Sequence, residues 1–197
     1  VKVGCKPNAH VYNALINGFV GAFKFEDAIR VFREMGSEHC SPTIVTYITL
    51  INGLCRAERF SEAYDLVKEM LEKGLKPGVI TYSVLMKGLC LGDKVDMALN
   101  LWNRVINKGF KPDVQMHNIL IHGLCSVGKT QHAVSLYLDM NYWNCAPTLV
   151  THNTLMGGFY KEGDLPSASV IWARILRNGL QPDIIPYNIT LKGLCSC

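Results

Sequence analysis

One segment of the sequence matches a motif of nucleotide-binding enzymes. Residues 123–130, GLCSVGKT, fit G-x-x-x-x-G-K-[ST], the pattern of a phosphate-binding P-loop. In such a loop a strand leads into a glycine-rich turn, and the backbone N–H groups of the turn face the phosphates at the start of a helix. The match therefore predicts ATP or GTP binding only if Gly123 follows a strand.

Cysteine and histidine are the other residues whose chemistry has to be considered. The sequence has eight cysteines and six histidines, and it contains no C-x-x-C pair. Seven cysteines recur at multiples of one spacing, Cys55, Cys90, Cys125 and Cys195 in one set and Cys5, Cys40 and Cys145 in another. A residue that recurs in this way fills the same small apolar site each time, as buried free cysteine does. We therefore predict no metal site, no catalytic histidine and a reducing compartment.

The composition limits the classes of protein that the chain can represent. Of its 197 residues, 49% are hydrophobic and 18% are charged, and the net charge is +4. This mild positive charge suits an anionic partner without requiring one. No apolar run approaches the roughly 20 residues of a membrane span. We therefore expect a large core and no membrane partner.

Proline recurs every 35 residues along the sequence, at Pro7, Pro42, Pro77, Pro112, Pro147 and Pro182. A constant period of this length indicates an array of supersecondary units. Counted from two residues after each proline, the complete repeats are 9–43, 44–78, 79–113, 114–148 and 149–183. Residues 1–8 would end a preceding repeat and 184–197 would begin a further one, so we expect one array, 1–197, cut from a longer protein. Positions within a repeat are numbered 1 to 35 from these starting residues.

Each repeat has the pattern of two amphipathic helices. Apolar residues fall at i, i+3, i+4 and i+7 in both halves of the repeat 44–78, at Tyr47, Leu50, Ile51 and Leu54 and then at Ala63, Leu66, Val67 and Met70. Glycines such as Gly74 suit the C′ position of the second helix, and the proline after them cannot continue it. No segment has the alternation of a strand. The sequence therefore predicts an all-α solenoid of 35-residue helix-turn-helix repeats.

Small residues at two positions indicate where the helices pack. Position 10 is glycine in all six copies, Gly18, Gly53, Gly88, Gly123, Gly158 and Gly193. Position 20 is alanine in all five, Ala28, Ala63, Ala98, Ala133 and Ala168. We expect them to allow a close approach of helices. Because Gly123 is one of them, it should lie inside a helix, with Gly128, Lys129 and Thr130 in the following turn. GLCSVGKT is then a chance match, and we predict no nucleotide cofactor.

These residues carry a resemblance to a known family. The segments VTYITLINGLCRAERFSEAYDLVKEMLEKGLKPG and ITYSVLMKGLCLGDKVDMALNLWNRVINKGFKPD closely resemble the pentatricopeptide repeat, and the 35-residue length is typical of its P-type subfamily. Tetratricopeptide repeats differ in their period of 34 and in a signature that is missing here. The resemblance implies a right-handed superhelix that binds single-stranded RNA, one base per repeat. It also implies a nucleus-encoded protein, mostly of plants, that acts in an organelle.

The resemblance further implies which residues read the bases. In the family, positions 5 and 35 face the RNA; here position 5 holds Asn13, Ile48, Ser83, Asn118, Asn153 and Asn188, and position 35 holds Thr43, Gly78, Asp113, Thr148 and Asp183. The residues themselves suit this role, because a core position would not be polar in five of six copies. Asparagine offers both a donor and an acceptor. The alternative is that position 5 is a helix N-cap, where Asn and Ser are favoured.

Two further positions complete the expected interface. Position 2, which in the family sandwiches each base, holds Val45, Ile80, Val150 and Ile185, whereas His10 and Gln115 depart from the pattern. Position 13, where the family tends to place a cation for the RNA backbone, gives Arg56 and Lys161. These two could equally be solvated residues at a helix end.

The resulting expectation is a binding module and not an enzyme. The resemblance implies support of RNA processing, stabilisation or translation, with accessory RNA-processing proteins as further partners. It also implies a mitochondrial location, with the chloroplast as the alternative and a transit peptide outside this segment. The competing hypothesis is a scaffold that binds proteins or peptides, since stacked helical hairpins also form grooves for these.

Overall fold

The structure, a computed structural model, describes residues 7–38 and 40–195. Every regular element in these ranges is a helix, which confirms the predicted all-α class. The helices are α1 (Ala9–Gly21), α2 (Phe25–Ser37), α3 (Ile44–Arg56), α4 (Phe60–Glu72), α5 (Val79–Leu91), α6 (Val95–Asn107), α7 (Val114–Ser126), α8 (Thr130–Tyr142), α9 (Leu149–Lys161), α10 (Leu165–Arg177) and α11 (Ile184–Cys195). Each odd-numbered helix begins at position 1 of a repeat, and each even-numbered one at position 17.

The side chain at position 35 caps the helix that follows it. Asn8 Oδ1 accepts a hydrogen bond from the N–H of Val11 (3.1 Å), and Asp113 Oδ1 accepts one from the N–H of Met116 (2.7 Å). Thr43 caps α3 from an extended backbone conformation (φ −100°, ψ 170°). The alternative that position 5 is the N-cap is therefore wrong, because position 5 lies inside the helix, a full turn beyond its start.

Glycine at the C′ position ends the second helix of a repeat, as predicted. Gly74 follows α4 with φ +75°, and Gly109 follows α6 with φ +82°, in the left-handed region that favours glycine. Gly4, which we expect at the same position of the preceding repeat, lies outside the described residues. In the repeat 114–148 the left-handed residue is Asn144 (φ 56°), the type that tolerates this conformation best after glycine.

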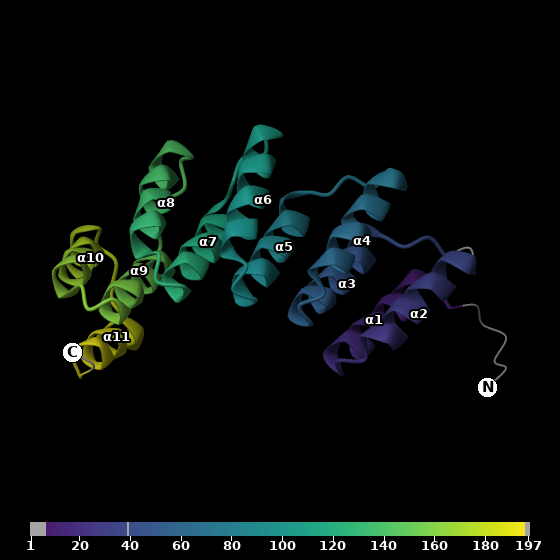
Figure 1. Cartoon of the computed structure of the whole chain (residues 1–197), viewed down its shortest axis with the longest axis horizontal. Coiled ribbons are helices and arrows are strands. Elements are labelled where there is room, and N and C mark those ends of the chain that lie inside the picture. Colours follow the sequence, from purple (N-terminus) through teal and green to yellow (C-terminus); the bar gives the residue numbers. More distant parts are fainter. Residues whose placement is uncertain (1–6, 39, 196–197) are drawn as a thin grey trace. The chain divides into compact units, whose positions relative to one another are not determined.

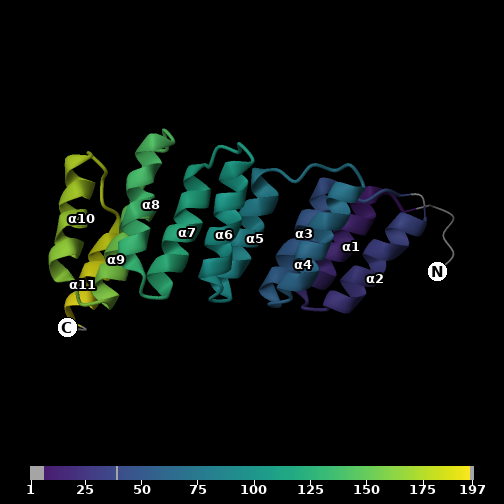
Figure 2. The same ribbon diagram turned by 45° about the horizontal axis from the view of Figure 1, so that its top comes forward.

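The chain divides between Gly92 and Asp93 into two compact units, inside the repeat 79–113. In the first unit, the hairpins α1–α2 and α3–α4 lie next to each other, and α1, α3 and α5 form one layer (Figure 1). In the second unit, α6 packs on α7, and the hairpins α7–α8 and α9–α10 are followed by α11 (Figure 2). Here α7, α9 and α11 form the layer of first helices.

Glycine at position 10 allows the first helices of successive repeats to touch. A Cβ atom added at Gly53 would lie 2.8 Å from Val20 Cγ1, and one at Gly158 would lie 2.7 Å from Cys125 Sγ. At Gly88 it would overlap the Cys55 side chain. Position 12 of one repeat therefore fills the space left by position 10 of the next, which confirms the predicted packing role at these glycines and at Cys55 and Cys125. It is not confirmed everywhere, because an added Cβ at Gly18 has nothing within 4 Å, Cys40 is half-buried and Cys195 is exposed.

Position 20 is alanine in every complete repeat, and its side chain is always completely buried, at Ala28, Ala63, Ala98, Ala133 and Ala168. Burial also raises the pKa of three position-12 thiols, to about 12 for Cys55 and to about 11 for Cys90 and Cys125. These thiols stay protonated at neutral pH, so they act as small apolar side chains.

The segment that matched the P-loop pattern begins in a helix and continues into a turn, as predicted, except that Thr130 is the first residue of α8 and not part of the turn. Gly123 lies within α7, and Lys129 precedes α8 with its Nζ 2.8 Å from Asp96 Oδ1. The buried Thr130 donates its backbone N–H to Glu162 Oε1 at 3.0 Å. A carboxylate therefore already occupies a backbone N–H at the start of α8, where a P-loop would place phosphate.

Membrane-spanning helices and metal-binding clusters are both absent from the described residues. No helix in them is long and apolar enough to cross a membrane. No group of three or more His, Cys, Asp or Glu side chains in residues 7–38 and 40–195 is arranged to hold a metal ion.

Candidate nucleic-acid interface

The structure brings positions 5 and 35 of the first repeat to one point, although they are far apart in sequence. Asn13 lies in α1, and Thr43 caps α3. Thr46, at position 3 of the following repeat, joins them: its Oγ1 donates to Asn13 Oδ1 (2.7 Å) and lies 3.1 Å from Thr43 Oγ1. The N–H of Thr43 also donates to Thr46 Oγ1 (3.0 Å). The two predicted reading side chains therefore belong to one hydrogen-bonded cluster.

The same cluster recurs in the second unit. Thr151 Oγ1 donates to Asn118 Oδ1 at 2.7 Å and lies 3.2 Å from Thr148 Oγ1. The N–H of Thr148 donates to Thr151 Oγ1 at 3.0 Å. Asn118 is half-buried and Thr148 is exposed, whereas Thr151 is completely buried. The repeated geometry shows that the arrangement follows from the repeat and not from one local sequence.

The second repeat has the same backbone but lacks these polar groups. Position 5 is Ile48 and position 35 is Gly78, so neither side chain can form a hydrogen bond. Thr81 occupies position 3 and is 1% exposed, and its hydroxyl has no partner among the described residues. Thr81 therefore has the hydroxyl found in the other clusters, but the asparagine and threonine that would bond to it are missing.

The fifth repeat shows the converse. Asn153 at position 5 is 8% exposed, and its Oδ1 has no hydrogen-bond partner in the described part of the chain. Position 3 of the following repeat is Pro186, which has no hydroxyl. Asp183 at position 35 accepts the N–H of Ile185 at 2.9 Å. The amide oxygen of Asn153 is therefore a buried acceptor without a donor among the described residues.

Ser83 and Asp113 lie in different units, and each is described by itself. Ser83 is 7% exposed and donates its hydroxyl to the carbonyl of Val79 (2.9 Å). Asp113 is exposed and caps α7, as described above. Asn188, the last predicted reading residue, is exposed on α11.

The predicted stacking residues at position 2 are apolar and exposed on the first turn of their helices. The exposed fractions are 62% for Val45, 68% for Ile80, 61% for Val150 and 52% for Ile185. Each follows the cap residue at position 35 by two residues. An exposed apolar side chain beside convergent polar groups offers a planar ligand both a contact surface and hydrogen bonds.

The two predicted phosphate contacts lie at the other end of the first helices. The guanidinium of Arg56 is exposed and lies 4.9 Å from the centre of the Phe23 ring, which holds it by a cation–π interaction. Lys161 is exposed, and together with His122, Ser126 and Asn153 it lines a hollow of about 230 Å³. In the second unit a cation and a reading amide therefore share one hollow.

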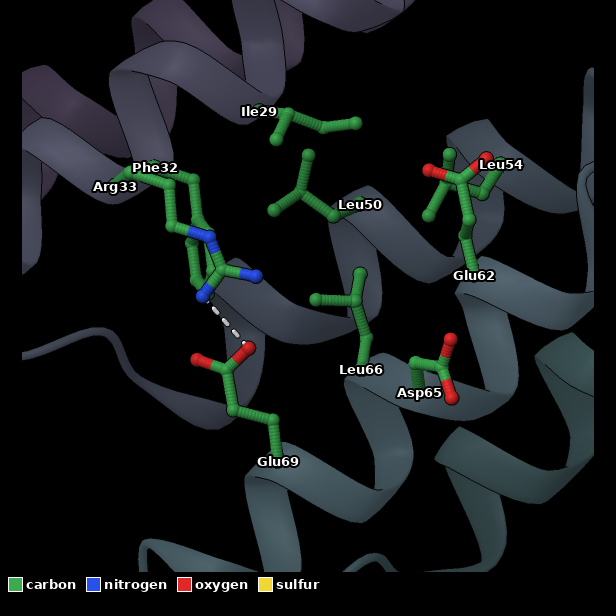
Figure 3. A pocket seen from close by; sticks show the side chains of 9 residues that line it. All are labelled: Ile29, Phe32, Arg33, Leu50, Leu54, Glu62, Asp65, Leu66 and Glu69. Carbon is green, nitrogen blue, oxygen red and sulfur yellow. Dashed lines mark hydrogen bonds and ion pairs between the residues drawn. The ribbon is translucent and has the colours of Figure 1, made fainter.

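Another pocket, of about 180 Å³, lies between α2 and α4, in the layer of second helices. Figure 3 shows Phe32, Leu50 and Leu66 on its walls and the ion pair between Arg33 and Glu69 (2.7 Å) at its edge. Burial alone would raise the pKa of Glu69, but hydrogen bonds from Lys73, Arg33 and Tyr47 lower it. The carboxylates of this pocket make it unsuitable for phosphate.

The histidines at position 4 support the fold. His117 Nδ1 donates to the carbonyl of Asp113 (2.9 Å), and His152 Nδ1 donates to that of Thr148 (2.8 Å). The hydroxyl of Tyr137 lies 3.2 Å from His152 Nε2. Burial lowers the pKa of both histidines, so they are neutral at pH 7. Both rings therefore serve the packing of the helices.

Sequence reasoning missed the threonines at position 3. A polar residue that recurs at one position next to the apolar face was the available signal, since position 3 is threonine in three of six copies: Thr46, Thr81 and Thr151. The partner of each hydroxyl lies in the preceding repeat, so the sequence of a single repeat does not show what the threonine contacts.

Comparison with protein families agrees with this geometry. The model of the PPR repeat family matches residues 7–56, 42–91, 114–161 and 147–196, and a PPR repeat model matches 80–110. Together the matches cover nearly the whole chain. The chain therefore belongs to the pentatricopeptide repeat family. A search of curated proteins gives no match.

Solved structures share the fold. The maize pentatricopeptide repeat protein PPR10 is 22% identical, with a TM-score of 0.82 over 96% of this chain and 27% of that one. The structure of PPR10 in complex with an 18-nucleotide psaJ RNA element is also 22% identical, with a TM-score of 0.83 over 99% of this chain and 29% of that one. The PPR domain of Arabidopsis thaliana PRORP1 in complex with tRNA is 14% identical, with a TM-score of 0.71 over 94% of this chain and 98% of that domain. The chain spans less than a third of the PPR10 chains.

Proposed function

We propose that the chain binds single-stranded RNA in a sequence-specific manner, with one base per repeat. The observation that carries this proposal is the convergence of positions 5 and 35 on one hydrogen-bonded cluster beside an exposed apolar side chain, as at Asn13, Thr43 and Val45. The cluster recurs 105 residues further along the chain at Asn118, Thr148 and Val150. Bases that stack on apolar side chains and present their edges to polar groups fit such a periodic surface.

The pairs of side chains at positions 5 and 35 give the proposed base preferences. By the family's pattern, Ser83 with Asp113 favours guanine and Asn153 with Asp183 favours uracil. Asn with Thr, in the first and fourth repeats, prefers a pyrimidine weakly. Ile48 with Gly78 has no hydrogen-bonding side chain and should accept any base. The proposed target, read 5′ to 3′, is pyrimidine, any base, G, pyrimidine, U and, through Asn188, a pyrimidine.

The similar structures support the RNA-binding part of this proposal, because PPR10 and the PRORP1 domain were both solved with RNA. We further propose that the protein acts in an organelle, the mitochondrion or else the chloroplast. There it would support processing, stabilisation or translation of RNA together with accessory RNA-processing proteins. We regard the chain as a binding module and not an enzyme, without nucleotide or metal cofactors.

The test is a binding series with one base changed at a time. Fluorescence anisotropy of the 197-residue chain with RNA that contains UAGUUU should show weak binding, since the chain has few repeats. Ser83→Asn gives the third repeat the same Asn–Asp pair that the fifth repeat has. The preferred third base should then change from G to U while the preference for the fifth base stays the same.

An unchanged third-base preference in this variant would contradict the proposal. The hypothesis of a protein- or peptide-binding scaffold would then be favoured. Selection of bound sequences from a random RNA pool gives an independent check, because it requires no assumed register between the repeats and the bases.

A further inference from the structure

The threonine at position 3 connects the two reading positions of the preceding repeat. We propose that Thr46 and Thr151 are positioning residues that fix the orientation of the reading amides of Asn13 and Asn118 and so set their base preference. This inference rests on the proposed function of positions 5 and 35. Both threonines are completely buried, so they act on a base only through the asparagine.

The hydrogen bonds of each cluster have one consistent direction. Thr151 Oγ1 accepts the N–H of Thr148 and donates its single proton to Asn118 Oδ1. Because that proton is used, the hydroxyl of Thr148 is the donor in its 3.2 Å contact with Thr151. The chain of hydrogen bonds therefore runs from Thr148 through Thr151 to the amide oxygen of Asn118. The same reasoning applies from Thr43 through Thr46 to Asn13.

This direction determines which amide atom is left for a base. An asparagine amide has an acceptor oxygen and a donor nitrogen on opposite sides of Cγ. The structure places Oδ1 on the threonine hydroxyl, so the NH₂ group of the amide lies on the side away from it. Asn118 therefore presents its Nδ2 hydrogens, which match the O2 and O4 atoms of uracil and the O2 and N3 atoms of cytosine. Both pyrimidines offer acceptors to this donor, so the donor does not separate U from C.

Two other repeats show what happens when one member is missing. Thr81 has the buried hydroxyl, but position 5 of the preceding repeat is Ile48, and the hydroxyl has no partner in residues 7–38 and 40–195. Asn153 has the amide, but position 3 of the following repeat is Pro186, and Oδ1 has no partner in the same ranges. An unpaired buried polar atom costs free energy, so each site is ready to accept the missing partner.

The first experiment removes the hydroxyl. Thr151→Val should lower the ratio of affinities for pyrimidine over purine at the fourth base by about 2- to 10-fold, the value of one hydrogen bond. Thr151→Ser should restore the ratio. Thr81→Val is the matched control and should leave the preference at every base unchanged, because its hydroxyl has no partner.

The second experiment creates the missing contact. Ile48→Asn gives the hydroxyl of Thr81 an acceptor, and a pyrimidine preference should then arise at the second base. In Ile48→Asn/Thr81→Val that preference should be weaker by a similar factor of about 2 to 10. The side-chain NH₂ signals of Asn118 in ¹H–¹⁵N spectra provide a readout without RNA: they should shift in Thr151→Val and stay in place in Thr81→Val.

Asn118→Ala separates the failure of this inference from the failure of base reading. If Asn118→Ala removes the fourth-base preference and Thr151→Val lowers the affinity for all four bases equally, then Thr151 is only structural and the inference is wrong. If Asn118→Ala leaves the preference unchanged, base reading itself fails and the inference falls with it. Loss of preference in both variants, with recovery in Thr151→Ser, supports it.

Discussion

Two stripes of residues run along the first helices, and they differ in how much they vary. The packing stripe consists of positions 10 and 12, and the reading stripe consists of positions 5 and 35. In the packing stripe a glycine faces a Val, Cys or Tyr side chain at each contact described, as at Gly53, Gly158 and Gly193. The reading stripe has Asn–Thr, Ile–Gly and Asn–Asp pairs on the same backbone.

The difference shows that the residues that stabilise the fold and the residues proposed to read bases occupy different positions of the repeat. A close helix–helix contact tolerates few side chains, because an added carbon atom would overlap its neighbour. Most reading positions are half-buried or exposed around the start of a helix, where different side chains fit, as Asn13 and Ile48 illustrate; Ser83 and Asn153 are buried. Position 35 is the exception, since it also caps the next helix. The two stripes therefore predict opposite results for substitution.

The largest effect is expected in the packing stripe. Gly88→Leu places a side chain where even a Cβ atom overlaps Cys55, and it should lower the free energy of unfolding by about 1–3 kcal/mol. Chemical denaturation measures the change. Gly18→Ala is the control, because nothing lies within 4 Å of its added Cβ, and it should be neutral or stabilising. Equal stability of Gly88→Leu and the wild type would contradict the conclusion that position 10 lies at a close helix–helix contact.

The next effect is expected at position 35, where one side chain both caps a helix and is proposed to read a base. Asp113→Ala removes the cap on the N–H of Met116 and should lower the stability by about 0.5–2 kcal/mol. The same variant should also lose the preference for guanine at the third base. Asp113→Asn keeps a side-chain oxygen for the cap, so its melting temperature should stay close to that of the wild type while the base preference changes. A parallel loss of both properties in Asp113→Asn would show that capping and reading cannot be separated.

A smaller effect depends on pH. Burial lowers the pKa of His117 and His152 below the 6.5 of a free histidine, so the unfolded chain binds protons more readily than the folded one. Stability should therefore be fully present above pH 6.5 and decrease as the pH falls below it. The double variant His117→Tyr/His152→Tyr carries the residue that other repeats have at position 4. Its stability should vary less over this range, as thermal melts at several pH values would show.

The smallest effect is expected for Lys129→Ala, which breaks an exposed ion pair with Asp96. Such pairs contribute about 0–1 kcal/mol. RNA affinity and base preference should be unchanged, and Mg-ATP should not raise the melting temperature of the wild type. Stabilisation by Mg-ATP that disappears in Lys129→Ala would contradict the interpretation of GLCSVGKT as a helical segment and turn without nucleotide binding.

The sequence by itself determined the elements and the packing of this protein. The 35-residue period, the helical spacing and the small residues at positions 10 and 20 all depend on contacts that are the same in every copy. Such contacts leave one residue type at one position, as at Gly53 and Ala63, and a constant residue can be recognised from the sequence alone.

Only the tertiary structure decided how the reading positions are connected. It placed the helix cap at position 35 and so excluded the alternative of a cap at position 5, and it joined Asn118 to Thr148 through the buried hydroxyl of Thr151. It also left Thr81 Oγ1 and Asn153 Oδ1 without hydrogen-bond partners among the residues that the structure describes. A hydrogen bond between residues 33 apart exists only because two helices of successive repeats lie side by side. Its presence depends on both residue types at once, which the pattern within one repeat does not contain.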